Sequence, residues 1–138
     1  MRGLRKLYNQ DIAFQAKDWN GRDVFCDRGT AKSHVARFHT DAALAVDRLK
    51  TSLPHPAYVI NCDAASSENA IYQLAIGDHP WLVVAIKSLW VARSKVKVAK
   101  VRLISTWYSF PEDQLQKELN KGRVIWPKAS KLPSITTA

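Results

Sequence analysis

Alternating apolar and polar residues predict a β-hairpin over residues 11–28. Apolar side chains occupy every second position on either side of the pair Asn20 and Gly21. They are Ile12, Phe14 and Ala16 before it, and Val24 and Cys26 after it. An Asn-Gly pair supplies the positive φ angles of a two-residue type I′ turn, so the two runs are expected to pair. We expect a short helix at Leu4–Asn9 to precede this hairpin.

A second pattern, with apolar residues three and four positions apart, predicts helix in the next segment. Its apolar positions are Val35, Phe38, Ala42, Val46, Leu49 and Leu53. Thr30 can cap the start of a helix, and Thr40 with Asp41 forms a second capping signal. We therefore expect two helices, about 31–38 and 40–53, that meet at His39. The two prolines that follow end the pattern.

The remaining chain is predicted to form mainly strands. They are Ala57–Asn61, Asn69–Ile76, Trp81–Val91 and Val96–Tyr108, with a polar loop at Asp63–Glu68. Trp81–Val91 is apolar at both odd and even positions, which is typical of a central strand covered on both faces. A short helix over 111–122, acidic at its start and closed by a glycine, and a last edge strand over 123–126 complete the pattern.

This order of elements predicts an α+β fold. We expect an N-terminal hairpin and helices packed on a mainly antiparallel four-stranded sheet, with a short C-terminal helix. The 138 residues, 46% of them hydrophobic, suit a single domain over 1–138. Residues 127–138 contain two prolines and small polar residues, and are expected to be a loosely ordered tail.

Charge is the strongest compositional signal. The chain has 21 Lys and Arg against 12 Asp and Glu, a formal net charge of +9. Such an excess favours a polyanionic partner, most often nucleic acid, although it can also serve solubility alone. The two cysteines are too few for a zinc motif or a disulfide framework, and are expected to be reduced.

No membrane segment is expected, because no apolar run approaches the roughly 18 residues that span a bilayer. The chain starts without the apolar stretch of a secretory signal, which favours a cytoplasmic site of action. A toxin domain delivered as part of a secreted or phage-encoded protein would look the same.

The cations concentrate in one part of the chain. No Asp or Glu occurs from His79 through Pro111, whereas that stretch contains Lys87, Arg93, Lys95, Lys97, Lys100 and Arg102. Strict alternation would put Lys100, Arg102, Ile104, Thr106 and Tyr108 on one face of the last long strand. Such a face suits RNA, because its cations can bind phosphates while its hydroxyl and phenol groups orient a ribose or stack on a base. The alternative interpretation is an ordinary solvated face without a binding role.

Among the histidines, His39 borders the apolar helical stripe and is the first candidate for a general base. His55 and His79 adjoin prolines and are expected in loops without a role. The nucleotide-loop, zinc-protease and hydrolase motifs are missing, and carboxylates are not clustered among the strands. We therefore expect neither metal nor cofactor. RNA cleavage would then proceed by attack of the 2′-hydroxyl on the adjacent phosphate, with a base, cations and a proton donor.

The segment SHVARFHTDAALAVDRLKTSLPHPAYV and the later LISTWYSF resemble a ribonuclease superfamily. It is the barnase, EndoU, colicin and RelE-like (BECR) superfamily, particularly its phage-associated branch. The resemblance rests on His34, His39 and Asp41 before an amphipathic helix, on Pro56 before a strand, and on the Thr-x-Tyr spacing at the strand end. It covers about residues 22–110.

The resemblance implies a metal-independent, toxin-like endoribonuclease acting on tRNA, rRNA or mRNA, with a neutralising antitoxin or immunity protein as partner. Its implied catalytic candidates are His39, His34, Thr106 and Tyr108. The candidates for RNA and phosphate binding are Arg37, Lys87, Lys100 and Arg102.

Two alternatives use the same features without cleavage. A nucleic-acid-binding module would use the basic face alone. A phage-type inhibitor protein would bind an acidic protein surface and could anchor on exposed tryptophans, although most of the five are expected in the core.

Overall fold

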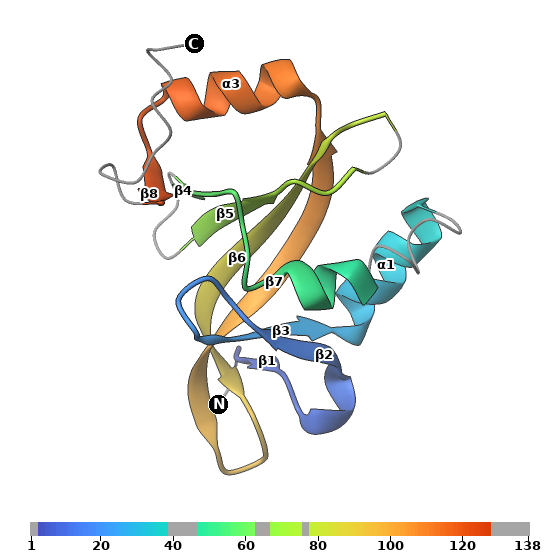
Figure 1. Cartoon of the computed structure of the whole chain (residues 1–138). Helices are drawn as coiled ribbons and strands as arrows, with labels where there is room; N and C mark the ends of the chain where they lie inside the picture. The colour runs from blue at the N-terminus through green and yellow to red at the C-terminus, as the bar shows by residue number, and fades with distance from the viewer. Residues whose placement is uncertain (1–2, 39–46, 63–66, 76–77, 128–138) are drawn as a thin grey trace.

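The computed structural model describes residues 3–38, 47–62, 67–75 and 78–127. Eight strands and three labelled helices follow one another along this part of the chain (Figure 1). In order they are β1 (Arg5–Lys6), the 3-10 helix η1 (Asn9–Asp11), β2 (Ile12–Lys17), β3 (Asp23–Asp27), α1 (Arg28–Phe38), β4 (Tyr58–Asn61), β5 (Ser67–Tyr72), β6 (Trp81–Ala92), β7 (Val98–Phe110), α3 (Glu112–Asn120) and β8 (Val124–Trp126). Residues 47–52 are also helical.

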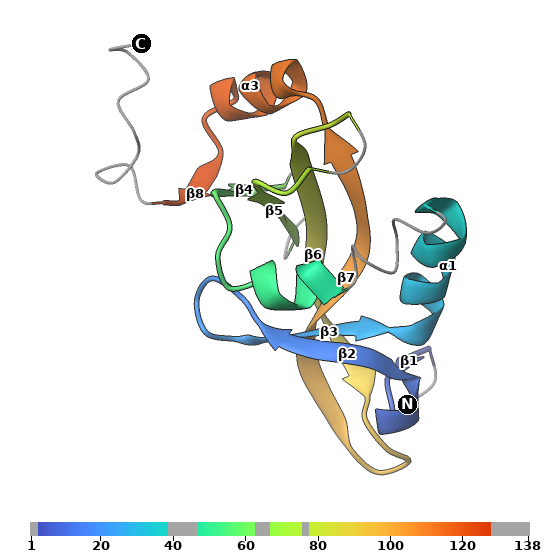
Figure 2. The same ribbon diagram turned by 45° about the vertical axis from the view of Figure 1, so that its right-hand side comes forward.

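All eight strands belong to one mixed sheet, so the predicted α+β layout of helices on a four-stranded sheet is wrong. The strand order is β2-β3-β7-β6-β5-β4-β8, with β1 beside β6. The predicted hairpin is not a separate layer, because β3 pairs in parallel with β7 at Val24–Arg102 and Phe25–Leu103. This pairing satisfies backbone groups on the edge of β7 that would otherwise lack partners. Figures 1 and 2 show β6 and β7 as two long curved strands that connect both ends of the molecule.

The N-terminal hairpin itself is confirmed, with a longer loop than predicted. The Asp18 N–H donates to the Arg22 carbonyl at 2.8 Å, so three residues lie between the paired ends. Gly21 has a φ of 72°, as the αL position of such a loop requires. The Asp18 carboxylate accepts the N–H groups of Asn20 and Arg22, at 2.8 and 2.9 Å, and these bonds stabilise the longer loop.

The helix predicted at Leu4–Asn9 is also wrong. Residues 5 and 6 instead form β1, which pairs in parallel with Val91 and Ala92 of β6. Leu7 is fully buried, and its N–H donates to the Ala92 carbonyl at 2.9 Å. Burial of one leucine against the sheet and these bonds to β6 favour an extended backbone over a single short turn of helix.

Helix α1 begins at Arg28, three residues earlier than predicted. The Asp27 carboxylate accepts the Thr30 N–H at 2.7 Å, so Asp27 caps this helix and Thr30 lies within its first turn. The predicted junction at His39 lies outside the described residues. Residues 128–138, most of the predicted tail, lie outside them as well.

The later elements agree with the pattern to within a few residues, except that the strand predicted at Asn69–Ile76 begins at Ser67 and ends at Tyr72. Strand β6 is covered on both faces as expected, since Val83 and Val84 are both 0% exposed. Trp107, Tyr72 and Cys26 belong to the largest core cluster on one face. Smaller clusters lie around Leu115 of α3 and around Leu7. Both cysteines are free, as predicted.

Candidate nucleic-acid interface

The far half of the β6–β7 hairpin, residues 88–102, extends beyond the rest of the sheet (Figures 1 and 2). We call this segment the basic arm. Its tip is a tight turn in which the Arg93 N–H donates to the Lys97 carbonyl at 2.8 Å. The Ser94 hydroxyl oxygen accepts the N–H groups of Val96 and Lys97, at 3.2 and 3.0 Å. The tip is therefore a defined turn that presents its side chains outward.

The cations of the basic arm fall into two classes. Arg93 and Arg102 are engaged within the fold: Arg93 donates to the Leu7 carbonyl and to Asn9, and lies 5.1 Å from the ring centre of Phe25. Lys95, Lys97 and Lys100 are exposed, and within the described part of the chain none of them forms an ion pair. These three lysines are free to bind an anion.

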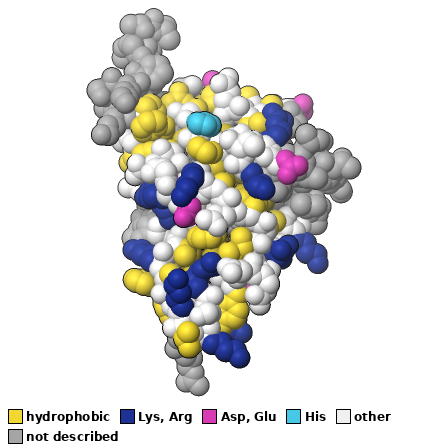
Figure 3. Space-filling view, turned by 60° about the horizontal axis from the view of Figure 1, so that its bottom comes forward, with side chains coloured by type: hydrophobic (Ala, Val, Ile, Leu, Met, Phe, Trp, Pro, Cys, Tyr) yellow, Lys and Arg dark blue, Asp and Glu magenta, His cyan; other side chains and the backbone are white. Residues whose placement is uncertain are grey.

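Hydrophobic side chains stand beside these lysines. Trp90 of β6 lies directly opposite Lys100 of β7 and is 58% exposed. Val96, at the tip, is 93% exposed. Figure 3 views the molecule with this end brought forward and shows Lys and Arg side chains interspersed with hydrophobic ones. An exposed indole beside a lysine is the arrangement that stacks a base and holds its phosphate.

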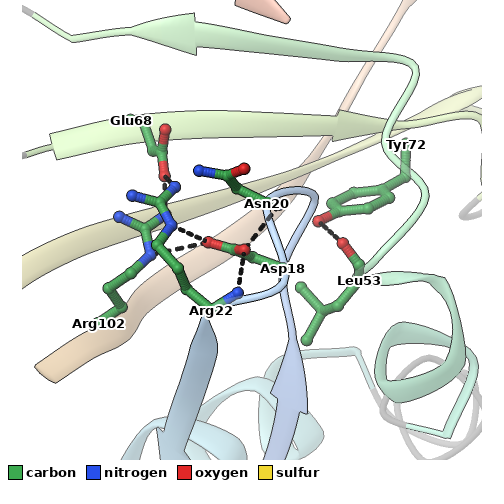
Figure 4. Close-up of polar contacts among 7 residues, drawn as sticks. All are labelled: Asp18, Asn20, Arg22, Leu53, Glu68, Tyr72 and Arg102. Atoms are coloured by element: carbon green, nitrogen blue, oxygen red, sulfur yellow. Dashed lines mark hydrogen bonds and ion pairs between the residues drawn. The ribbon is translucent and has the colours of Figure 1, made fainter.

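A buried ionic network lies next to this pair on the same face of the sheet (Figure 4). Arg102, whose side chain is 13% exposed, pairs with Asp18 at 2.9 Å and also with Glu68. Arg22 pairs with the same two carboxylates, at 3.0 Å from Asp18 and 3.6 Å from Glu68. Burial lowers the pKa of Arg102, and the charge of Arg22 lowers it further, while Asp18 opposes the shift. The network joins the β2–β3 loop to β5 and β7.

A polar pocket of about 230 Å³ opens at this network. It is lined by Arg22, Asn61, Ser67, Glu68, Ser88 and Arg102. Ser88 lies opposite Arg102 in the β6–β7 ladder, and the next pair on the same face is Trp90 with Lys100. The pocket and the exposed tryptophan are therefore neighbours on one continuous surface.

A larger hollow, about 310 Å³, lies elsewhere. It is lined by Thr51, Ser52, His55, Pro56, Ala57, Tyr72, Gln73 and Leu74. None of these residues is Lys or Arg. The smaller pocket, in contrast, adjoins the basic arm.

The structure divides the row of side chains predicted on one face of β7. Thr106 pairs with Ala85 and Ile104 with Ile86, so Ser105 is an extra residue, a β-bulge. Beyond the bulge the alternation reverses. Lys100, Arg102 and Ile104 share one face, whereas Thr106 and Tyr108 lie on the other. The prediction that all five side chains share one face of the strand is therefore wrong.

Tyr108 lies among groups of the opposite face. Its ring is 5.3 Å from that of Phe110, and it packs against the cluster that includes Leu115. Burial raises the pKa of Tyr108, and Cys62 and Glu118 raise it further. Lys87 lies opposite Leu103 and points away from the face of Trp90 and Lys100, because it occupies the other parity of β6.

The remaining predicted site residues belong to the helical segment. His34 and Arg37 lie in α1, and His39 lies outside the described residues. Of the two other histidines, His55 is exposed in a loop, and His79 shares a hydrogen bond of 2.8 Å between its Nδ1 and the Ser109 Oγ.

Sequence reasoning missed Asp18, Arg22, Glu68 and Ser88 as parts of a site. Asp18 and Arg22 belong to the β2–β3 loop, whereas Glu68 belongs to β5. Only the pairing of β3 with β7 and of β5 with β6 brings these two segments together. The pairing of Trp90 with Lys100 was missed as well, because the hairpin is centred on Lys95, whereas the predicted strands, which end at Val91 and resume at Val96, would pair Trp90 with Lys97.

Within the described residues, no helix combines the length and the apolar character that crossing a bilayer requires. Comparisons of this chain with protein-family models, with curated proteins and with solved structures found no match.

Proposed function

We propose that this protein binds single-stranded RNA through the basic arm. The observation that carries the proposal is the exposed pair of Trp90 and Lys100 in a stretch of chain without any acidic residue. Trp90 supplies a stacking surface for a base, and Lys100 supplies the charge for its phosphate. Lys95 and Lys97 extend the positive surface to the tip.

A single strand suits this surface better than a duplex. Bases of a duplex are stacked on one another, so their faces are not available to an indole on a sheet surface. The arm, which is strand and turn over residues 88–102, also cannot read bases in the deep, narrow major groove of an RNA duplex.

Endoribonuclease activity with His39 as base stays a prediction that goes beyond this proposal. Lys100 and Arg102 on one face of β7, and Thr106 with Tyr108 on the other, do not meet around one phosphate. Binding therefore rests on described residues, whereas cleavage rests on the helical segment.

Fluorescence anisotropy with a short labelled single-stranded RNA of mixed sequence tests the proposal. Trp90→Ala removes one stacked base, and we expect it to weaken binding about 5- to 100-fold, the range for base–aromatic stacking. Trp90→Phe keeps a ring and is expected to retain most of the affinity. Lys100→Glu is expected to weaken binding at least as much as Trp90→Ala.

Lys117→Glu is the matched control, because it makes the same charge change at an exposed lysine of α3, at the other end of the sheet (Figure 1). Equal losses from Lys100→Glu and Lys117→Glu would show that net charge alone drives binding. No binding of the unaltered protein at low salt would refute the proposal.

A further inference from the structure

The pocket beside the basic arm continues the proposed binding surface by one step. Three successive cross-strand pairs share this face of β6 and β7. They change from buried Ile86 and Ile104, through Ser88 and Arg102 at the pocket, to exposed Trp90 and Lys100. Neighbouring pairs on one face are separated by about 7 Å along the strands. An RNA strand with one base stacked on Trp90 therefore brings its next nucleotide to the pocket.

The charge of the pocket does not suit a phosphate. Arg22 and Arg102 are each paired with both Asp18 and Glu68, so two positive charges meet two negative ones. A phosphate would have to approach the Glu68 carboxylate, which lines the pocket. A neutral, flat group with its own donors and acceptors avoids this repulsion and can use the polar lining.

Glu68 determines which neutral group fits. Both arginines pair with its Oε1 atom, and Figure 4 shows the other carboxylate oxygen pointing away from the guanidinium groups. An ionised carboxylate only accepts hydrogen bonds, so its partner must carry N–H groups. The exocyclic amino group of cytosine, adenine or guanine meets this need. Uracil has a carbonyl oxygen where cytosine has its amino group, and the carboxylate repels it.

We propose that this pocket receives one unstacked base of the bound RNA and selects a base with an exocyclic amino group over uracil. Glu68 accepts a hydrogen bond from that amino group. Arg102, held rigidly by Asp18, forms the pocket wall, and the half-exposed Arg22 lies at its rim. The inference rests on the proposed binding of single-stranded RNA and adds a preference for particular bases.

Two labelled RNAs test it: one made of uridine only, and one with a single central cytidine among uridines. The two bases have nearly the same shape; they differ at C4, which carries an amino group in cytosine and a carbonyl oxygen in uracil, and at N3, which carries a hydrogen only in uracil. We expect the cytidine-containing RNA to bind roughly 10-fold more tightly, the discrimination given by one hydrogen bond to a charged group. Equal binding of both RNAs would refute the pocket and leave the proposed function intact. If neither RNA binds, both the pocket and the proposed function are refuted.

Two variants assign the preference to the pocket. Glu68→Gln presents an amide that can accept from cytosine or donate to uracil, so the ratio of the two affinities is expected to fall close to one. Ser88→Leu fills the pocket from the β6 side without altering the ionic network and is expected to have the same effect. The uridine RNA is expected to bind Ser88→Leu as it binds the unaltered protein, and to bind Glu68→Gln more tightly, because the amide removes the repulsion of uracil and can donate to it. A preference that survives Ser88→Leu would place its origin elsewhere and overturn the inference, even if Glu68→Gln fails to fold.

Discussion

Arg102 and Thr106 lie on opposite faces of β7, although four positions separate them and a regular strand would place them on the same face. The extra residue between them is Ser105, whose hydroxyl donates to the Ala85 carbonyl at 3.3 Å. The bulge directs Arg102 toward Asp18 and Glu68 and directs Tyr108 toward the cluster beneath α3. Side chains of one strand, β7, thereby lie in two separate environments, an ionic network and an apolar cluster.

Salt dependence measures how many phosphates the tip lysines neutralise. Each phosphate contact on a single strand contributes a slope of about −0.7 to a plot of log affinity against log salt concentration. Lys95→Gln combined with Lys97→Gln is expected to reduce the magnitude of that slope by about 1.4, if each lysine holds one phosphate. The same double change at Lys117 of α3 and at Lys121, the residue that follows this helix, should leave the slope unaltered. An unchanged slope in the arm variant would exclude the tip from the RNA contact.

The buried network predicts a large difference between two aspartates of one hairpin. Asp18 has a fully buried side chain that pairs with Arg22 and Arg102. Asp18→Asn leaves two guanidinium groups with one carboxylate, and is expected to lower the free energy of unfolding by about 3–5 kcal/mol. Asp23→Asn, which removes a solvent-exposed pair with Lys17, is the control and should have little effect. Urea unfolding of both variants measures the contrast, and similar losses would contradict it.

Cys26 makes stability depend on pH in the alkaline range. Burial raises its pKa from 9.0 to about 12. The unfolded chain therefore loses this proton at lower pH than the folded protein does. The stabilisation is complete below pH 9 and is lost as the pH rises from 9 toward 12. Its steepest contribution is about 1.4 kcal/mol per pH unit.

Unfolding by urea at a series of alkaline pH values tests this dependence. Cys26→Ala is expected to unfold more easily at neutral pH, because it leaves a small cavity, and to show a shallower decline above pH 9. Cys62→Ala is the control and should decline as the unaltered protein does. Identical declines in all three proteins would show that Cys26 does not ionise on unfolding in this range.

Cleavage of RNA tests the residues of the helical segment. If the chain is an endoribonuclease, incubation with total RNA in the presence of EDTA yields discrete fragments with 2′,3′-cyclic phosphate ends. His39→Ala is then expected to abolish cleavage while RNA binding by the arm is retained. His55→Ala removes an exposed loop histidine and is the matched control. Intact RNA that is still retarded on a gel would favour the binding module alone, and cleavage by His39→Ala at the normal rate would exclude His39 as the base.

Local signals in the sequence predicted the local structure well. Asn20 and Gly21 marked the first hairpin, and the long apolar run beginning at Trp81 marked a strand buried on both faces. The acidic start and the glycine after α3 located the last helix. Each of these features depends on residues close together in the chain, where alternation, helical spacing and turn chemistry apply directly.

The features that sequence reasoning missed depend on distant partners. The parallel pairing of Val24 with Arg102 joins segments with no local signal of contact, and it adds β2 and β3 to the sheet. The pairing of β1 with β6 and of β8 with β4 brings the sheet to eight strands. The bulge at Ser105 depends on the register with β6, and a one-residue change reverses every later side chain. For this reason Lys100 and Arg102 were predicted at the site, whereas Arg22 and the carboxylates of Asp18 and Glu68 were not.

The division of labour among the cations of the basic arm has an evolutionary consequence. Arg93 and Arg102 hold the arm to the N-terminal segment and to the β2–β3 loop, whereas Lys95, Lys97 and Lys100 have no role in the fold of the described residues. Affinity can therefore drift through changes at the three lysines while the scaffold keeps its stability. Selection for RNA binding then acts on the three lysines, whereas Arg93 and Arg102 are also constrained by the stability of the fold.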